Sequence, residues 1–130
     1  MLKNAIAFFL LMLPMTLLAE SPSAETEAKS WLELIDSQEY KKSWDESGEF
    51  FRSNISKETW VKAIDAARGS VGEIYTRNLL TEKPLTPLPN APKGEYVVLR
   101  YRSEFAYSNA TETLTLRNNN GWHVVGYFIK

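Results

Sequence analysis

The sequence contains no cysteine and a single histidine among its 130 residues. The lack of cysteine excludes disulfide frameworks, thiolate nucleophiles, iron–sulfur clusters and cysteine-ligated zinc. A single histidine excludes a metal site that is built from several imidazoles. Basic residues number 15 against 16 acidic residues, so no positive excess favours a nucleic-acid partner. We therefore predict no metal, no cofactor and no nucleic acid.

The N-terminal segment, residues 1–19, is typical of a secretory signal peptide. Lys3 gives it a positive start, an apolar run follows, and Ala19 is a small residue at a suitable cleavage point. An uncleaved anchor helix is the alternative, but the apolar run contains Pro14 and is shorter than the ~20 residues that a membrane span needs. We predict cleavage near Ala19, a periplasmic or secreted mature chain, and no membrane contact after cleavage.

The composition of the remaining chain is that of one folded domain. Hydrophobic residues make up 44% of the sequence and aromatic residues 12%, which disfavours disorder. We predict a flexible polar leader over residues 20–27 and a single domain over residues 28–130.

The first half of this domain has helical spacing of its apolar residues. The spacing predicts one helix from Ala28 to Ile35, and a second from Tyr40 that ends at Gly48. Ser56 can cap a third helix, which carries Trp60 and Ile64 on its apolar side and stops at Gly69.

The second half changes to the two-residue period of β-strands. Four strands are predicted, over residues 73–80, 96–105, 110–117 and 122–129. Residues 82–94 contain four prolines and predict an irregular, stiff loop. The order predicts an α+β fold in which three N-terminal helices pack on one face of a curved four-stranded antiparallel meander.

A family resemblance extends over most of the chain. It rests on the strings Trp31-Leu32-x-Leu34-Ile35-Asp36, Arg68-x-x-Val71-Gly72 and Gly121-Trp122-x-Val124-x-Gly126-Tyr127-Phe128-Ile129. In these the sequence resembles the exported bacterial family catalogued as domain of unknown function 4019, although Ser70 stands where we expect proline. That family implies an exported location and no catalytic residue. The order of elements also resembles the cone-shaped fold of nuclear transport factor 2 and ketosteroid isomerase, which implies a cone-like sheet around a pocket.

Three side chains are candidates for acid–base catalysis. His123 lies in the last predicted strand and has a side chain that titrates near neutral pH. Glu112 shares a strand face with two leucines, where a buried carboxylate needs a partner, and we favour an ion pair with Arg77, Arg100 or Arg102. Asp36 ends the first helix, where turn formation is the simpler interpretation.

Aromatic residues are the candidates for a ligand pocket. Their side chains could line an apolar cavity, although aromatic residues at this spacing more often fill a core. The candidates are Trp31, Trp44, Trp60, Tyr101 and Tyr127.

We favour a non-enzymatic module that binds a small apolar ligand or a partner protein. The alternative is a small cone-fold enzyme that performs acid–base chemistry on an apolar substrate. A homodimer is also predicted, because in the last strand both alternating sets are apolar: Trp122, Val124 and Phe128 on one face, and Val125, Tyr127 and Ile129 on the other. Leu85 and Leu88 of the proline-rich loop are the alternative cover for the outer face.

Overall fold

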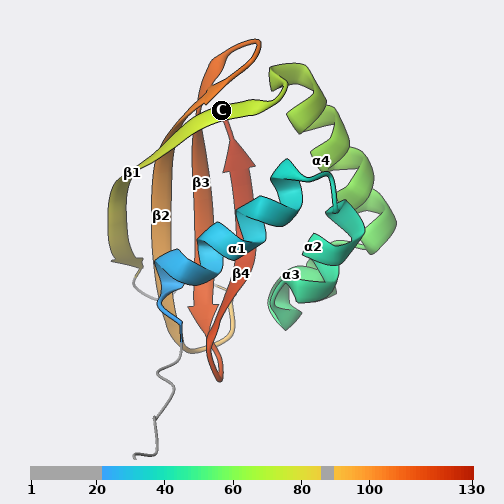
Figure 1. Ribbon diagram of the computed structural model, residues 1–130. Coiled ribbons are helices and arrows are strands. Elements are labelled where there is room, and N and C mark those ends of the chain that lie inside the picture. Colours follow the sequence, from blue (N-terminus) through green and yellow to red (C-terminus); the bar gives the residue numbers. More distant parts are fainter. Residues whose placement is uncertain (1–21, 86–89) are drawn as a thin grey trace, which may run out of the picture.

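The structure is a computed structural model that describes residues 22–85 and 90–130 (Figure 1). The described residues form four helices followed by four strands, which confirms the predicted α+β class. The helices are α1 (Ala24–Asp36), α2 (Tyr40–Glu46), α3 (Glu49–Asn54) and α4 (Lys57–Val71). The strands are β1 (Ile74–Leu85), β2 (Glu95–Phe105), β3 (Asn109–Asn118) and β4 (Trp122–Ile129). The short helix α3 is one more than the apolar spacing predicted.

Helix α1 begins earlier than predicted, because Ser23 caps it. The Ser23 side chain accepts a hydrogen bond from the Thr26 amide at 3.2 Å. The flexible leader predicted for residues 20–27 is therefore wrong from Ala24 onward. Ser56 caps α4 as predicted, through the Thr59 amide at 3.1 Å. The predicted signal segment lies outside the described residues, and no described helix is long and apolar enough to cross a membrane.

The sheet is an antiparallel meander in the order β1-β2-β3-β4. Helix α1 lies across one face, which we call the inner face, and α2, α3 and α4 group beside β4 (Figure 1). We call the opposite face of the sheet the outer face. Alternation along β2 and β3 sends Leu99, Tyr101, Leu114 and Leu116 to the inner face, as predicted.

Strand β1 is longer than predicted and includes the start of the proline-rich segment. It extends to Leu85, and Pro84 lies opposite Val97 in the ladder. Proline is tolerated there because β1 is an edge strand, so one side of its backbone needs no ladder partner. Leu88 lies outside the described residues.

Two tryptophans fill the space between α1, α4 and the sheet. Trp31 and Trp60 are 2% and 6% exposed, and their ring centroids are 5.9 Å apart. The Trp31 indole N–H donates to the Ser43 carbonyl at 3.0 Å and the Ser47 hydroxyl at 3.1 Å. The Trp60 indole N–H donates to the Ser43 hydroxyl at 3.0 Å. Both indoles are thus buried without an unsatisfied donor.

A β-bulge in β4 changes which side chains of that strand face the helices. Thr115 pairs with Gly126 but the next residue, Leu116, pairs with Val124, so Val125 is an extra residue. Alternation therefore shifts by one position at the bulge. Tyr127 consequently shares the inner face with Val124.

The predicted assignment of the two faces of β4 is wrong for this reason. Tyr127 and Ile129 lie opposite Leu114 and Glu112 on the inner face, and Phe128, 60% exposed, is left on the outer face. The expected second apolar set is therefore not present on the outer face of β4. The homodimer was predicted from that second apolar set, so the structure of β4 does not support the prediction.

Candidate functional site

A buried polar network lies between α1 and the inner face of the sheet. Its centre is Glu112, which is 0% exposed. The Glu112 carboxylate accepts from Arg77 Nε at 2.7 Å, from the Ser103 hydroxyl at 2.5 Å and from the Tyr127 hydroxyl at 2.5 Å. This confirms the predicted ion pair and selects Arg77 as the arginine that makes it.

Asp36 joins the same network from the end of α1. Its carboxylate accepts from Arg77 Nη1 at 2.8 Å and Arg77 Nη2 at 2.9 Å, and also from Arg68 Nη1 at 2.9 Å. The simple turn interpretation of Asp36 is therefore incomplete, because its side chain closes an ion network between α1, α4 and β1. Two arginines and two carboxylates balance each other in formal charge.

The network raises the pKa values of two of its members, Arg77 and Tyr127. Burial disfavours the charged form of Arg77, but its hydrogen bonds to Asp36 and Glu112 outweigh this and raise the pKa of its guanidinium. Burial raises the pKa of the Tyr127 hydroxyl, and the adjacent negative charge of Glu112 raises it further. Tyr127 is therefore a hydrogen-bond donor throughout the physiological pH range.

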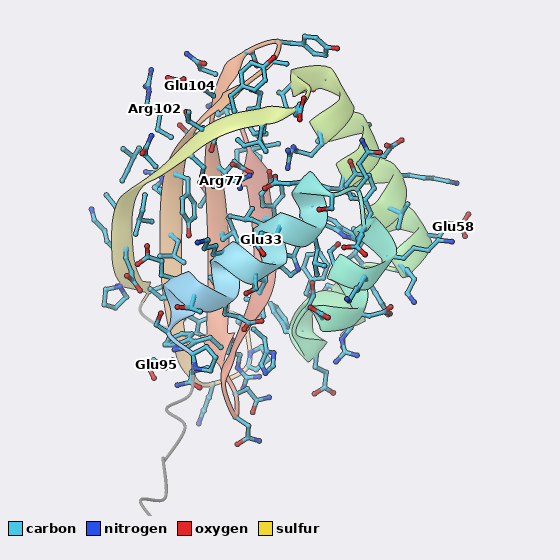
Figure 2. The ribbon with its side chains drawn as sticks, viewed as in Figure 1. Glu33, Glu58, Arg77, Glu95, Arg102 and Glu104 are labelled. Atoms are coloured by element: carbon cyan, nitrogen blue, oxygen red, sulfur yellow. The ribbon has the colours of Figure 1, made fainter. Side chains whose placement is uncertain are left out.

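A groove of about 390 Å³ opens beside this network, between α1 and strands β1 and β2. We call it the α1–sheet groove. Its apolar wall consists of Leu32, Leu79 and Tyr101. Asp36 and Arg77 of the network also line it. The rest of the lining consists of the charged side chains Glu25, Lys29 and Glu33. Arg77 lies beside α1, and Glu33 lies on that helix (Figure 2).

The Tyr101 hydroxyl is the unusual group of this groove. Tyr101 is 6% exposed, and its hydroxyl oxygen is buried without a hydrogen-bond partner among the described residues. Burial raises the pKa of this hydroxyl to about 12, and Glu25 adds to the effect. Buried hydroxyls are nearly always paired, so an unpaired hydroxyl on a residue that lines the groove is unusual.

Five aromatic residues were predicted to line a pocket, and one of them, Tyr101, lines the α1–sheet groove. Trp31, Trp60 and Tyr127 pack against each other, with Tyr127 5.5 Å from Trp31 and 6.4 Å from Trp60 between ring centroids. Trp44 lies away from them, where its indole N–H donates to the Ile55 carbonyl at 2.9 Å. These four aromatic residues fill the core or its border.

His123 does not converge with the other catalytic candidates. It lines a separate depression of about 410 Å³, together with Glu27, Glu46 and Glu49. Burial raises the pKa of Glu27, and the nearby His123 partly lowers it. Within residues 22–85 and 90–130, no group of three or more His, Asp or Glu side chains is arranged to hold a metal ion.

Sequence reasoning missed two members of the network, Arg68 and Ser103. Arg68 is 6% exposed and continues the spacing of Trp60 and Ile64 along the buried side of α4. Ser103 is 0% exposed and continues the inward set of β2. Arg68 stands where the helical period of α4 predicts an apolar residue, and Ser103 stands where the two-residue period of β2 does. A polar residue at such a position is the sequence signal that could have identified both.

Comparison with known protein families assigns the chain to one of them. Residues 27–127 match the family described as "Protein of unknown function (DUF4019)". The chain belongs to this family. The match includes Asp36, Arg68, Arg77, Tyr101 and Glu112, so the network and most of the groove lie inside the family region. No curated protein matches the chain. The likeness to the nuclear transport factor 2 fold stays a prediction.

Proposed function

We propose that this member of the family is an exported, non-catalytic binding domain. Its ligand is a small amphipathic molecule held in the α1–sheet groove. The apolar part of the ligand lies on Leu32 and Leu79, and a polar atom of the ligand hydrogen-bonds to the Tyr101 hydroxyl. The unpartnered, buried hydroxyl carries the proposal, because burying a hydroxyl without a partner costs free energy that a bound ligand would recover.

The network favours an uncharged polar group on this ligand. The three donor nitrogens of Arg77 all donate to Asp36 or Glu112, so the guanidinium has little capacity left for a carboxylate. The Tyr101 hydroxyl suits a carbonyl or hydroxyl oxygen. The ligand class is therefore apolar molecules with a carbonyl or hydroxyl group.

The same contacts disfavour acid–base catalysis in the groove. A general base needs a free lone pair within reach of substrate. Both oxygens of Asp36 accept from arginine, and Glu112 is fully buried with four hydrogen bonds. His123 lines another depression. We therefore rank binding above the alternative of a small cone-fold enzyme.

The groove can be tested with Nile red, an uncharged dye that carries a carbonyl. The chain from Glu20 should enhance the emission of the dye in a saturable titration. Leu79→Glu should abolish this binding, and Leu80→Glu is the matched control, because Leu80 is the next residue but lies on the outer face. Tyr101→Phe should weaken binding about three- to tenfold, the free energy of one hydrogen bond. If the wild type, Leu79→Glu and Tyr101→Phe bind the dye equally well, the proposal that the groove is the ligand site is wrong.

Export is tested separately on the full-length gene product. Protein from the periplasmic fraction should begin near Glu20 by intact-mass analysis, because the apolar run of residues 1–19 ends in a small residue. Full-length protein in the membrane pellet would contradict export. A native mass spectrum of the same preparation reports the retained ligand and the oligomeric state together.

A further inference from the structure

The outer face of the sheet presents ordered rows of side chains. The strand register aligns one row across all four strands, Thr81, Arg100, Thr113 and Phe128. The adjacent row is Asn78, Arg102, Thr111 and Lys130. Arg102 and its neighbour Glu104 point away from the helices (Figure 2). This face belongs neither to the α1–sheet groove nor to the buried network.

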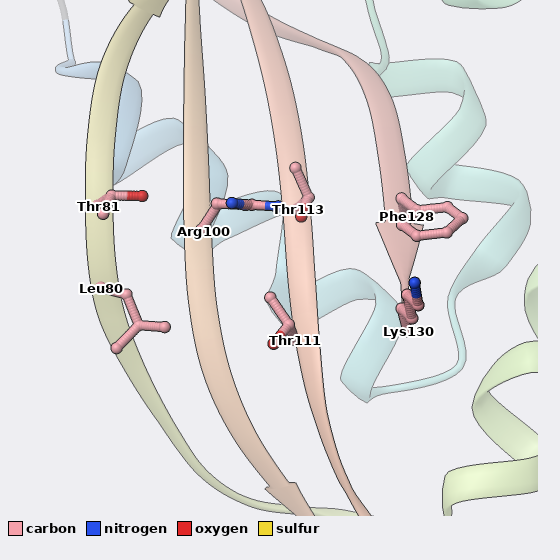
Figure 3. A pocket seen from close by; sticks show the side chains of 7 residues that line it. All are labelled: Leu80, Thr81, Arg100, Thr111, Thr113, Phe128 and Lys130. Atoms are coloured by element: carbon pink, nitrogen blue, oxygen red, sulfur yellow. The ribbon is translucent and has the colours of Figure 1, made fainter.

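A shallow hollow of about 500 Å³ lies on this face (Figure 3). Leu80 on β1 and Phe128 on β4 stand at its two sides, and they are 56% and 60% exposed. Between them, Arg100 extends toward Thr113 (Figure 3). The hollow therefore combines two exposed apolar side chains with a basic and hydroxyl-bearing floor.

The outer face is strongly biased toward positive charge. Its exposed basic side chains are Lys83, Arg100, Arg102 and Lys130, and its exposed acidic side chain is Glu104. None of these five forms an ion pair with another residue of the described ranges. The whole chain has a formal net charge of −1, whereas these four basic residues and one acidic residue together carry +3. Unpaired basic groups around an apolar-walled hollow attract acidic partners.

We propose that this hollow docks an acidic peptide segment of a partner protein. Carboxylates of the segment pair with Arg100 and Arg102, and an apolar side chain beside them packs against Phe128 or Leu80. A second copy fits less well, because symmetric pairing would bring two basic faces together. A hollow between separated apolar side chains also suits a chain segment better than a flat lipid surface.

The proposal can be tested by fluorescence polarisation with a labelled peptide of alternating Glu and Leu. The chain from Glu20 contains every contact described above and should bind this peptide, with affinity falling as salt rises. A peptide in which Gln replaces Glu should bind at least about tenfold more weakly, and Arg100→Glu should cause a similar loss. Phe128→Ser should weaken binding severalfold. Lys41→Glu, an exposed charge reversal on α2, should leave it unchanged.

Equal affinity for the Glu and Gln peptides, or unchanged binding by Arg100→Glu, would overturn the proposal. Cosedimentation with phosphatidylglycerol vesicles that requires Arg100, without peptide binding, would overturn it in favour of a lipid surface. Self-association that Arg100→Glu abolishes, again without peptide binding, would overturn it in favour of a second copy. Circular dichroism identifies any variant that fails to fold, and Arg100→Gln is then the milder replacement. Leu79→Glu should bind the peptide normally, which separates this surface from the groove.

Discussion

Arg77 and Asp36 form a two-pronged ion pair between β1 and the end of α1. Arg77 Nη1 lies 2.8 Å from Asp36 Oδ2, and Nη2 lies 2.9 Å from Oδ1. The remaining nitrogen, Nε, donates to Glu112 on β3 at 2.7 Å. One guanidinium thus joins the first helix to two strands, in the parallel geometry that makes arginine–carboxylate pairs strong.

Replacing Arg77 should strongly destabilise the fold. Arg77→Leu leaves Asp36 with one arginine and Glu112 with none, and an uncompensated buried charge costs about 3–5 kcal/mol. Arg102→Leu makes the same chemical change on the outer face and should change the free energy of unfolding by less than about 0.5 kcal/mol. Urea unfolding of both variants measures the difference. Similar midpoints would contradict the role given to Arg77.

Removing the Glu112 carboxylate should also destabilise the protein, by about 3 kcal/mol, because Ser103, Tyr127 and Arg77 each lose a buried acceptor. Glu104→Ala is the matched control, since Glu104 is an exposed carboxylate on β2. Thermal unfolding provides the measurement. An unchanged melting curve for Glu112→Ala would mean that the network adds nothing to stability.

Two tyrosines of the inner face should respond differently to the loss of their hydroxyls. Tyr127→Phe leaves Glu112 short of a donor and should lower the free energy of unfolding by about 1–3 kcal/mol. Tyr101→Phe removes an unpartnered hydroxyl and should leave stability at pH 8 unchanged or raise it by about 1 kcal/mol. Urea unfolding at pH 8 compares them. A loss in Tyr101→Phe as large as that in Tyr127→Phe would show that Tyr101 has a partner in the free protein.

Alkaline pH should destabilise the protein partly through Tyr101. Its pKa is raised from 10.0 to about 12 in the folded state, so the unfolded chain loses this proton first. Tyr101 therefore causes no pH-dependent loss of stability below pH 10, and the free energy of unfolding falls through this group as the pH rises from 10 toward 12. Unfolding free energies measured across this window should fall less steeply in Tyr101→Phe than in the wild type. Identical slopes would contradict the raised pKa.

Two glycine-to-alanine changes should have opposite signs. A Cβ at Gly48 would lie 2.9 Å from Val125 Cγ1 and 3.2 Å from His123 Cβ, where the start of α3 meets β4. Gly48→Ala should therefore cost about 1–3 kcal/mol through overpacking. A Cβ at Gly69 in α4 meets no atom within 4 Å, and Gly69→Ala should stabilise the helix by about 0.5–1 kcal/mol. Thermal unfolding distinguishes the two, and a stable Gly48→Ala would show that α3 can move away from β4.

The sequence alone determined that helices precede four strands, and it determined the faces of β2 and β3. Burial alternates from Val97 along β2 and from Thr111 along β3, so the inward positions of Tyr101 and Glu112 follow from a two-residue period. The same period required a cation for Glu112, because a carboxylate among leucines cannot be buried alone. These conclusions need no knowledge of which strands are neighbours.

Tertiary structure decided which groups meet. The choice of Arg77 depends on the register of β1 against β2, which places it opposite Ser103, whereas Arg100 and Arg102 point to the outer face. The extra residue Val125 breaks the period of β4, and periodicity by itself cannot place a bulge. Asp36 reaches the network because α1 crosses the inner face where it does, and the packing leaves the Tyr101 hydroxyl without a hydrogen-bond partner among the described residues. Local patterns fix the side of an element on which a residue lies, but contacts between distant residues depend on how the elements pack.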